Sequence, residues 1–193
     1  MGVYLQGLTM GLAYVAPIGL QNLFVINSAL THTRRRALLT ALIVIFFDVT
    51  LALACFFGVG AVMERYAWLQ MAILLVGSLI VIYIGVGLLR AKVAELEQSR
   101  AESSIRKTIS SACVVTWFNP QAIIDGTMML GAFHATLSGP EGITFITGVA
   151  SASCLWFTGV TLLISIFSNR FDAKILRIIN VVCGAVIIFY GCK

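Results

Sequence analysis

Six long apolar runs constrain the fold of this chain more than any other feature of its sequence. They cover residues 3–30, 37–63, 67–89, 108–134, 142–169 and 173–192. A helix needs about 20 apolar residues to cross the ~30 Å hydrocarbon core of a bilayer, so each run can supply one span. Only 11% of the residues are charged, against about 25% in soluble domains. The sequence therefore predicts an all-α integral membrane protein with six transmembrane helices, the last of them shortened by Lys174 and Arg177.

Positive charges gather on one side of these spans. Eleven of the 13 Lys and Arg residues follow the first, third and fifth runs, and only Arg65 and Lys193 lie on the other side. Because cytoplasmic loops carry the excess of Lys and Arg, the eleven are predicted to face the cytoplasm, with both termini outside. The polar segment 90–107 is then a cytoplasmic linker between two three-helix halves, residues 1–89 and 108–193, of one transmembrane domain. The net charge of +5 reflects this topology and indicates no nucleic-acid partner.

Two prolines occupy matching positions in the first and fourth runs. Pro17 stands in "VAPIGLQN" and Pro120 in "WFNPQAIID". Proline removes a backbone donor and clashes with the preceding turn, so both helices are predicted to break within the membrane. Because the two halves run in opposite directions, the pattern indicates inverted three-helix repeats with broken first and fourth helices. This arrangement is typical of transporters with a site at the membrane midplane.

Each break would change the chemistry of the membrane interior. Freed backbone groups are tolerated at this depth only when they face protein or a water-filled cavity. A new helix N-terminus carries partial positive charge and favours an anionic group such as a substrate carboxylate, and Gly19 allows close approach. Alternatively, the prolines only kink their helices, and neighbouring amide side chains satisfy the loosened backbone groups. These amides are Gln21, Asn22, Asn119 and Gln121.

Two acids, Asp48 and Asp125, lie inside apolar runs that contain no Lys or Arg to pair with them. A carboxylate at the bilayer centre costs about 2.5–3.5 kcal/mol on insertion scales, so such residues indicate function. Each can accept a proton or a cation. Together with two positive helix ends, they would suit a zwitterion that carries an extra positive charge. The alternatives are that Asp125 caps its own half-helix and that Asp48 hydrogen-bonds a neighbouring helix.

Four other features of the apolar runs have a structural interpretation that needs no functional role. Trp117 and Trp156 lie deeper than an interfacial belt, either as packing residues or over a cationic substrate. His134 is expected at the membrane interface. Gly7 and Gly11 form a GxxxG motif, which indicates close helix packing or a homodimer contact. The five cysteines contain no CxxC pair and are interpreted as packing residues, so neither a metal site nor a disulfide is predicted.

Three motifs carry a family resemblance that covers nearly the whole chain. The first is P-x-G-x-Q-N, formed by Pro17, Gly19, Gln21 and Asn22; the second is "DVTL", with Asp48; the third is "TWFNPQAIID", with Asn119, Pro120 and Asp125. With these motifs the chain resembles the LysE family of amino-acid exporters, and within it the lysine/arginine exporter branch. It departs from many relatives at Leu20, where they have a second proline.

The resemblance implies a multi-pass protein of the bacterial inner membrane. It would export basic L-amino acids (lysine, arginine or their toxic analogues) by secondary-active antiport with a proton or another coupling ion, without a cofactor and without enzymatic activity. Asp48 and Asp125 would couple proton movement to transport. The residues expected to bind substrate are Pro17, Gly19, Gln21, Asn22, Asp48, Asn119, Pro120, Asp125 and Trp156.

Two other functions remain as alternatives. A heavy-metal cation exporter of the same wider family would need thiolate or imidazole ligands close together, whereas the cysteines lie on different runs. A membrane thiol-electron carrier would need two redox cysteines near the helix breaks, but the first run contains no cysteine.

Overall fold

The computed structural model describes residues 2–58, 104–134, 136–137 and 139–167, together with the isolated positions 68, 71, 75, 79, 82, 86, 181 and 185. The 90–107 linker, except for its last four residues, therefore lies outside the described residues. The same holds for most of the third and sixth predicted spans. The division into two three-helix halves and the six-span inverted repeat remain predictions.

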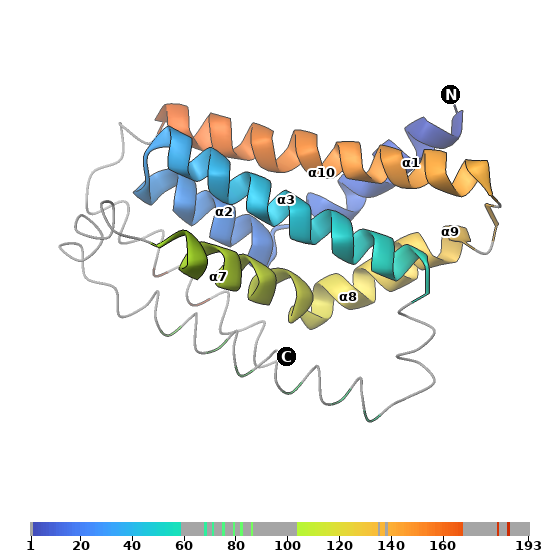
Figure 1. Ribbon diagram of the computed structural model, residues 1–193, viewed down its shortest axis with the longest axis horizontal. Helices are drawn as coiled ribbons and strands as arrows, with labels where there is room; N and C mark the ends of the chain where they lie inside the picture. Colours follow the sequence, from blue (N-terminus) through green and yellow to red (C-terminus); the bar gives the residue numbers. More distant parts are fainter. Residues whose placement is uncertain are drawn as a thin grey trace.

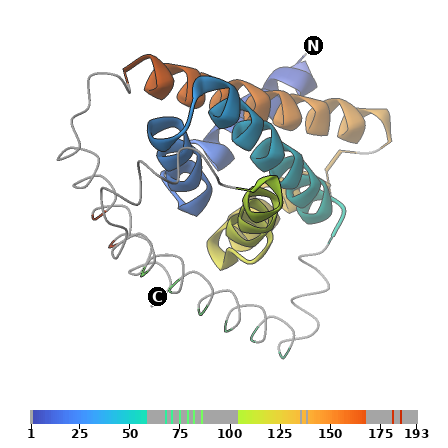
Figure 2. The same cartoon turned by 60° about the vertical axis from the view of Figure 1, so that its left-hand side comes forward.

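Every element in the described part of the chain is helical. In chain order the elements are α1 (Gly2–Val15), α2 (Leu20–Thr31), α3 (Arg34–Phe56), α7 (Ile105–Trp117), α8 (Pro120–Gly126), a π-helical turn η1 (Thr127–Gly131), α9 (Ala132–His134) and α10 (Pro140–Phe167). Figures 1 and 2 show α3 between α10 on one side and α7 on the other. Helix α10 also packs on α1 and α2. The core between these helices is built from side chains such as Val44, Phe56, Phe145, Val149 and Phe157.

Two described helices, Arg34–Phe56 and Pro140–Ile166, are each long and apolar enough to cross a membrane. The pair α1 and α2 also qualifies when it is taken as one span, bent by 77° at its break. These helices match the second, fifth and first predicted spans, and the described part of the chain is all-helical, as the sequence predicted. The beginnings of α3 and α7, with Arg34–Arg36 and Lys107, lie at the same end of the bundle (Figure 1).

Both proline-containing runs are interrupted, but the prolines act differently. In the first run, the last backbone bond of α1 joins Ala16 N–H to Leu12 O, and α2 begins after an extended Gly19. Pro17 thus lies inside the break, and it disfavours helix at the residue before it. In the fourth run, Asn119 is extended and Pro120 is the first residue of α8. Proline suits this position because its missing N–H would have no helical partner there.

The GxxxG motif of α1 packs within the chain. Helices α1 and α10 approach so closely that a Cβ atom on Gly7 would overlap the carbonyl oxygen of Phe145. A Cβ atom on Gly11 would lie 2.7 Å from the Cβ atom of Ala152, and one on Gly148 would overlap the carbonyl oxygen of Tyr4. Small residues permit such contact between transmembrane helices. The packing interpretation is therefore confirmed, and a homodimer remains a prediction that requires another surface.

Candidate functional site

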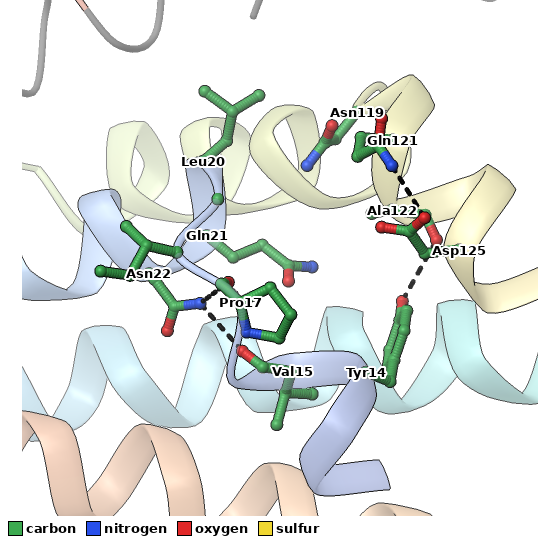
Figure 3. Close-up of a pocket in the computed structure, with 12 residues that line it drawn as sticks. Tyr14, Val15, Pro17, Leu20, Gln21, Asn22, Asn119, Gln121, Ala122 and Asp125 are labelled. Atoms are coloured by element: carbon green, nitrogen blue, oxygen red, sulfur yellow. Dashed lines mark hydrogen bonds between the residues drawn. The ribbon is translucent and has the colours of Figure 1, made fainter. Parts of the chain in front are cut away.

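A cavity of about 230 Å³ lies between the two helix breaks (Figure 3). Its walls come from the end of α1, the first break, the start of α2 and the start of α8. Six of the predicted substrate-binding residues line it: Pro17, Gly19, Gln21, Asn22, Asn119 and Asp125. Asp48, Pro120 and Trp156 do not line it, although Pro120 begins α8 beside Asn119. The structure therefore brings the two proline motifs together but leaves one of the two acids outside the cavity.

Asn22 holds the first break in shape. Its Nδ2 group donates hydrogen bonds to the carbonyl oxygens of Val15, at 2.9 Å, and Pro17, at 2.8 Å. Its Oδ1 atom accepts a hydrogen bond from the indole Nε1 of Trp156 at 2.7 Å. Both polar ends of this buried amide are thus engaged inside the protein. For Asn22, the structure agrees with the alternative in which an amide satisfies backbone groups that the break releases, and Trp156 supports that amide.

Replacing Asn22 with Ala should lower stability and slow transport together. The change leaves two buried carbonyl groups and the Trp156 indole without partners, and a buried unsatisfied polar group costs about 1–3 kcal/mol. Trp156→Phe is the graded companion, since it removes only the third bond and should cost less. Thermal unfolding of the detergent-purified variants measures the difference. Equal stability of Asn22→Ala and wild type would contradict this role.

Asp48 is fully buried on α3, behind the cavity wall. Its Oδ2 atom accepts a hydrogen bond of 2.6 Å from the Ser153 hydroxyl of α10, whereas Oδ1 has no hydrogen-bond partner. No Lys or Arg of the described segments forms an ion pair with it. The hydrogen bond to a neighbouring helix exists, as one alternative predicted, but it satisfies only one of the two oxygens. Buried polar atoms without partners are rare in native proteins and require an explanation.

Gln21 connects Asp48 to the cavity. It lines the cavity and is only 8% exposed, and its Nε2 group is buried without a hydrogen-bond partner. The same amide lies close enough to the Asp48 carboxyl to interact with it, although the two groups do not form a hydrogen bond. A donor without an acceptor therefore lies near an acceptor without a donor. A small rotation of the amide, or a water molecule between the two groups, would join them.

Asp125 lies in the cavity wall opposite the first break (Figure 3). Its Oδ1 atom accepts a hydrogen bond of 2.7 Å from Nε2 of Gln121, one turn earlier on α8. The alternative that Asp125 caps its own half-helix is wrong, because α8 already begins at Pro120 and its first turn contains no acid. The half-exposed carboxylate is therefore available to a positively charged group in the cavity.

Two residues that the sequence analysis missed complete this region, Tyr14 and Ser153. Tyr14 of α1 lines the cavity, and its hydroxyl lies 3.5 Å from the carbonyl oxygen of Ala122. The Tyr14 ring is buried, and its hydroxyl lies within electrostatic reach of the carboxyl groups of Asp48 and Asp125. The available signals were weak. They are a tyrosine three residues before Pro17 and a serine one turn before Trp156.

The remaining candidates from the sequence have packing roles. The indole Nε1 of Trp117 donates to the Thr50 hydroxyl at 3.3 Å, and the His134 ring contacts Phe56 and Phe57, with ring centroids 5.0 and 5.6 Å apart. Within the described ranges, no three His, Cys, Asp or Glu side chains are grouped as metal ligands would be.

Comparison with known proteins places the chain in a family. The model of the LysE type translocator family matches residues 12–193. The arginine exporter protein ArgO of Klebsiella pneumoniae (strain 342) is 35% identical over 191 residues, which cover 96% of this chain and 90% of that protein. ArgO of Salmonella newport (strain SL254) is 35% identical over 188 residues, covering 95% and 88% respectively. No solved structure matches the chain. The chain therefore belongs to the LysE family of translocators, and it is a multi-pass transporter of the inner membrane and not an enzyme.

Proposed function

We propose that the protein is a secondary-active exporter of basic L-amino acids, arginine or lysine, across the bacterial inner membrane. The observation that carries this proposal is the cavity between the two breaks, which presents an open helix N-terminus and a carboxylate to the same space. The names of its relatives, which are arginine exporters, support arginine as one substrate.

The two charged groups of the cavity suit the two ends of such a substrate. Helix α2 begins at the cavity with Gly19 as its N-cap residue, which makes no side-chain capping bond, so the first backbone N–H groups are open to a ligand. These groups and the helix dipole favour the α-carboxylate of an amino acid. Asp125, on the opposite wall, would bind the guanidinium or ammonium group of the side chain. A neutral amino acid would leave Asp125 without its partner.

Asp48 is the group that we assign to proton coupling. It is shielded from the cavity, so it can change its protonation state without direct contact with the substrate. When it is charged, its orphan oxygen attracts the Gln21 amide, and when it is protonated, that attraction weakens and the amide is released toward the cavity. A change in the protonation state of Asp48 would thereby change the position of the Gln21 amide in the substrate cavity. Inward movement of a proton would then accompany outward movement of the amino acid, while the two halves of the protein alternate access.

Transport by the purified protein in proteoliposomes tests this function. We expect radiolabelled arginine to exchange for unlabelled arginine or lysine, and an imposed proton gradient to drive arginine uphill. Citrulline, which has the shape of arginine without the charge, should compete poorly, and Cd²⁺ should neither be transported nor compete. Transport of Cd²⁺ without transport of arginine would replace the proposal with the metal-exporter alternative. Exchange of arginine without any uphill movement under an imposed proton gradient would reject the proton coupling.

A further inference from the structure

A second cavity, of about 160 Å³, lies between α2, α3 and α7, away from the helix breaks. All of its lining residues except Phe24 are polar: Asn27 and Ser28 from α2, His32 directly after α2, Thr40 from α3, and Lys107, Thr108 and Ser111 from α7. Its lining residues come from the end of α2 and from the first two turns of α3 and α7. Figure 1 shows that α3 and α7 begin at the same end of the bundle, and the charge asymmetry assigns that end to the cytoplasm. Arg36 of α3 links the two helices at this end, because its Nη2 group donates a hydrogen bond of 2.9 Å to the Thr108 hydroxyl of α7. We refer to this second cavity as the inner cavity.

The inner cavity offers two complementary kinds of group to a ligand. Lys107 supplies a basic nitrogen atom, the His32 ring of the same lining is held by a hydrogen bond of 3.0 Å between its Nδ1 atom and the Thr31 hydroxyl, and no acid of the described segments lines the cavity. Asn27 offers a hydrogen-bond acceptor, because its buried Oδ1 atom accepts no hydrogen bond within the protein. The hydroxyls of Ser28 and Thr40 are bonded to each other at 3.0 Å and do not satisfy that oxygen. A ligand with an anionic group and a nearby donor would pair with both the basic nitrogen and the Asn27 oxygen. The α-carboxylate and α-ammonium groups of an amino acid are such a combination.

One face of α2 connects the inner cavity with the cavity between the two helix breaks, which we call the central cavity. Gln21 lines the central cavity, whereas Phe24, Asn27 and Ser28 line the inner cavity. Residues three and four positions apart lie on the same helix face, and Gln21 and Asn27 are separated by about 9 Å along the axis. Phe24 lies between them and packs against the core. An amino acid in the inner cavity would therefore be one side chain away from the central cavity.

We propose that the inner cavity is a second amino-acid site, which binds the α-carboxylate and α-ammonium of the substrate on the cytoplasmic side before the substrate passes Phe24. This inference rests on the proposed export function. It divides recognition between two sites: the inner cavity reads the backbone groups shared by all amino acids, and Asp125 in the central cavity reads the cationic side chain. The inner site should consequently accept citrulline, which the central site disfavours.

Thiol labelling tests the inner site directly. In a cysteine-free variant that still transports arginine, Ser111→Cys places a thiol in the inner cavity, and Ser110→Cys places one on the exposed side of the same helix as the matched control. A membrane-impermeant maleimide is applied to inverted vesicles, whose cytoplasmic face is outward. Arginine at ten times its Kd should slow labelling of Ser111→Cys about tenfold and leave Ser110→Cys unchanged. Citrulline should protect as well, whereas agmatine, which lacks the carboxylate, should not.

Other outcomes overturn the proposal. Absence of labelling from the cytoplasmic face, or absence of protection by arginine, would reject an amino-acid site in this cavity. Protection by inorganic phosphate but not by citrulline would show a simple anion site instead. Protection that persists when Asn27→Leu is added would indicate a conformational change caused by binding elsewhere. Failure of the wild-type protein to transport arginine in proteoliposomes would be a separate result, because it would reject the export function and not binding in the inner cavity.

Discussion

Asp48→Asn is expected to abolish uphill export of arginine while preserving exchange of arginine for arginine. Asparagine nearly matches the shape of aspartate, and its Oδ1 atom can still accept the Ser153 hydrogen bond. It cannot take up a proton, so the variant should lose the link between the proton gradient and substrate movement. Uphill export should fall at least about 100-fold, which corresponds to roughly 2.7 kcal/mol. Exchange should stay within several-fold of wild type, because Asp48 does not line the central cavity.

Measurements in one batch of proteoliposomes separate the two activities. Exchange is followed without a gradient, and uphill transport is followed at several imposed pH differences. Ser153→Ala is the companion variant, since it removes the partner of Asp48 but keeps the titratable acid; it should alter the pH dependence of transport without abolishing uphill movement. Among the described residues, Tyr14 and Cys55 are the other titratable groups within electrostatic reach of Asp48, so Tyr14→Phe and Cys55→Ser complete the set. Normal gradient-driven export by Asp48→Asn would remove Asp48 from the coupling mechanism.

The positions of the helix breaks could be predicted from the sequence because their causes are local. Proline cannot donate a backbone hydrogen bond, and it restricts the residue before it, whatever the rest of the chain does. Pro17 and Pro120 therefore marked the breaks directly. The expectation that both breaks lie at one site came from the predicted inverted repeat, and both breaks do line one cavity, although the repeat itself remains a prediction. The different roles of the prolines, one inside its break and one starting a helix, depend on where each helix restarts, and the motif did not specify that.

The surroundings of the acids could not be predicted, because they depend on packing between distant segments. Ser153 is 105 residues from Asp48, and the two meet because α10 crosses α3. That crossing depends on the shapes of the packed helices, including the glycine contacts between α1 and α10. Hydropathy and charge showed that Asp48 has no cationic partner within its run. They did not show that Asp48 would lie outside the cavity, with the Gln21 side chain between the two. Asn22 was ambiguous for the same reason, since its bonds to the break and to Trp156 are visible only in three dimensions.

Asp125→Asn should remove the preference for a cationic side chain. The substitution keeps an acceptor for the Gln121 hydrogen bond and changes the volume little, so the cavity should retain its shape. What is lost is a charge-assisted contact to the guanidinium or ammonium group, and hydrogen bonds to charged groups contribute about 1.5–3 kcal/mol. The apparent Kd for arginine should therefore rise about 10- to 100-fold. Binding of citrulline should change little, so the ratio of the two affinities isolates the charge.

Competition against radiolabelled arginine, with protein at equal folded amounts, measures that ratio for wild type, Asp125→Asn and Gln121→Ala. Gln121→Ala is the matched control because it removes the neighbour of the carboxylate and leaves its charge in place; its preference for arginine over citrulline should persist. Asp125→Glu should restore part of the preference, since it returns the charge with a longer side chain. If Asp125→Asn distinguishes arginine from citrulline as well as wild type does, then the carboxylate in the cavity wall does not bind the substrate side chain. Charge selection must in that case occur before the substrate reaches the two helix breaks.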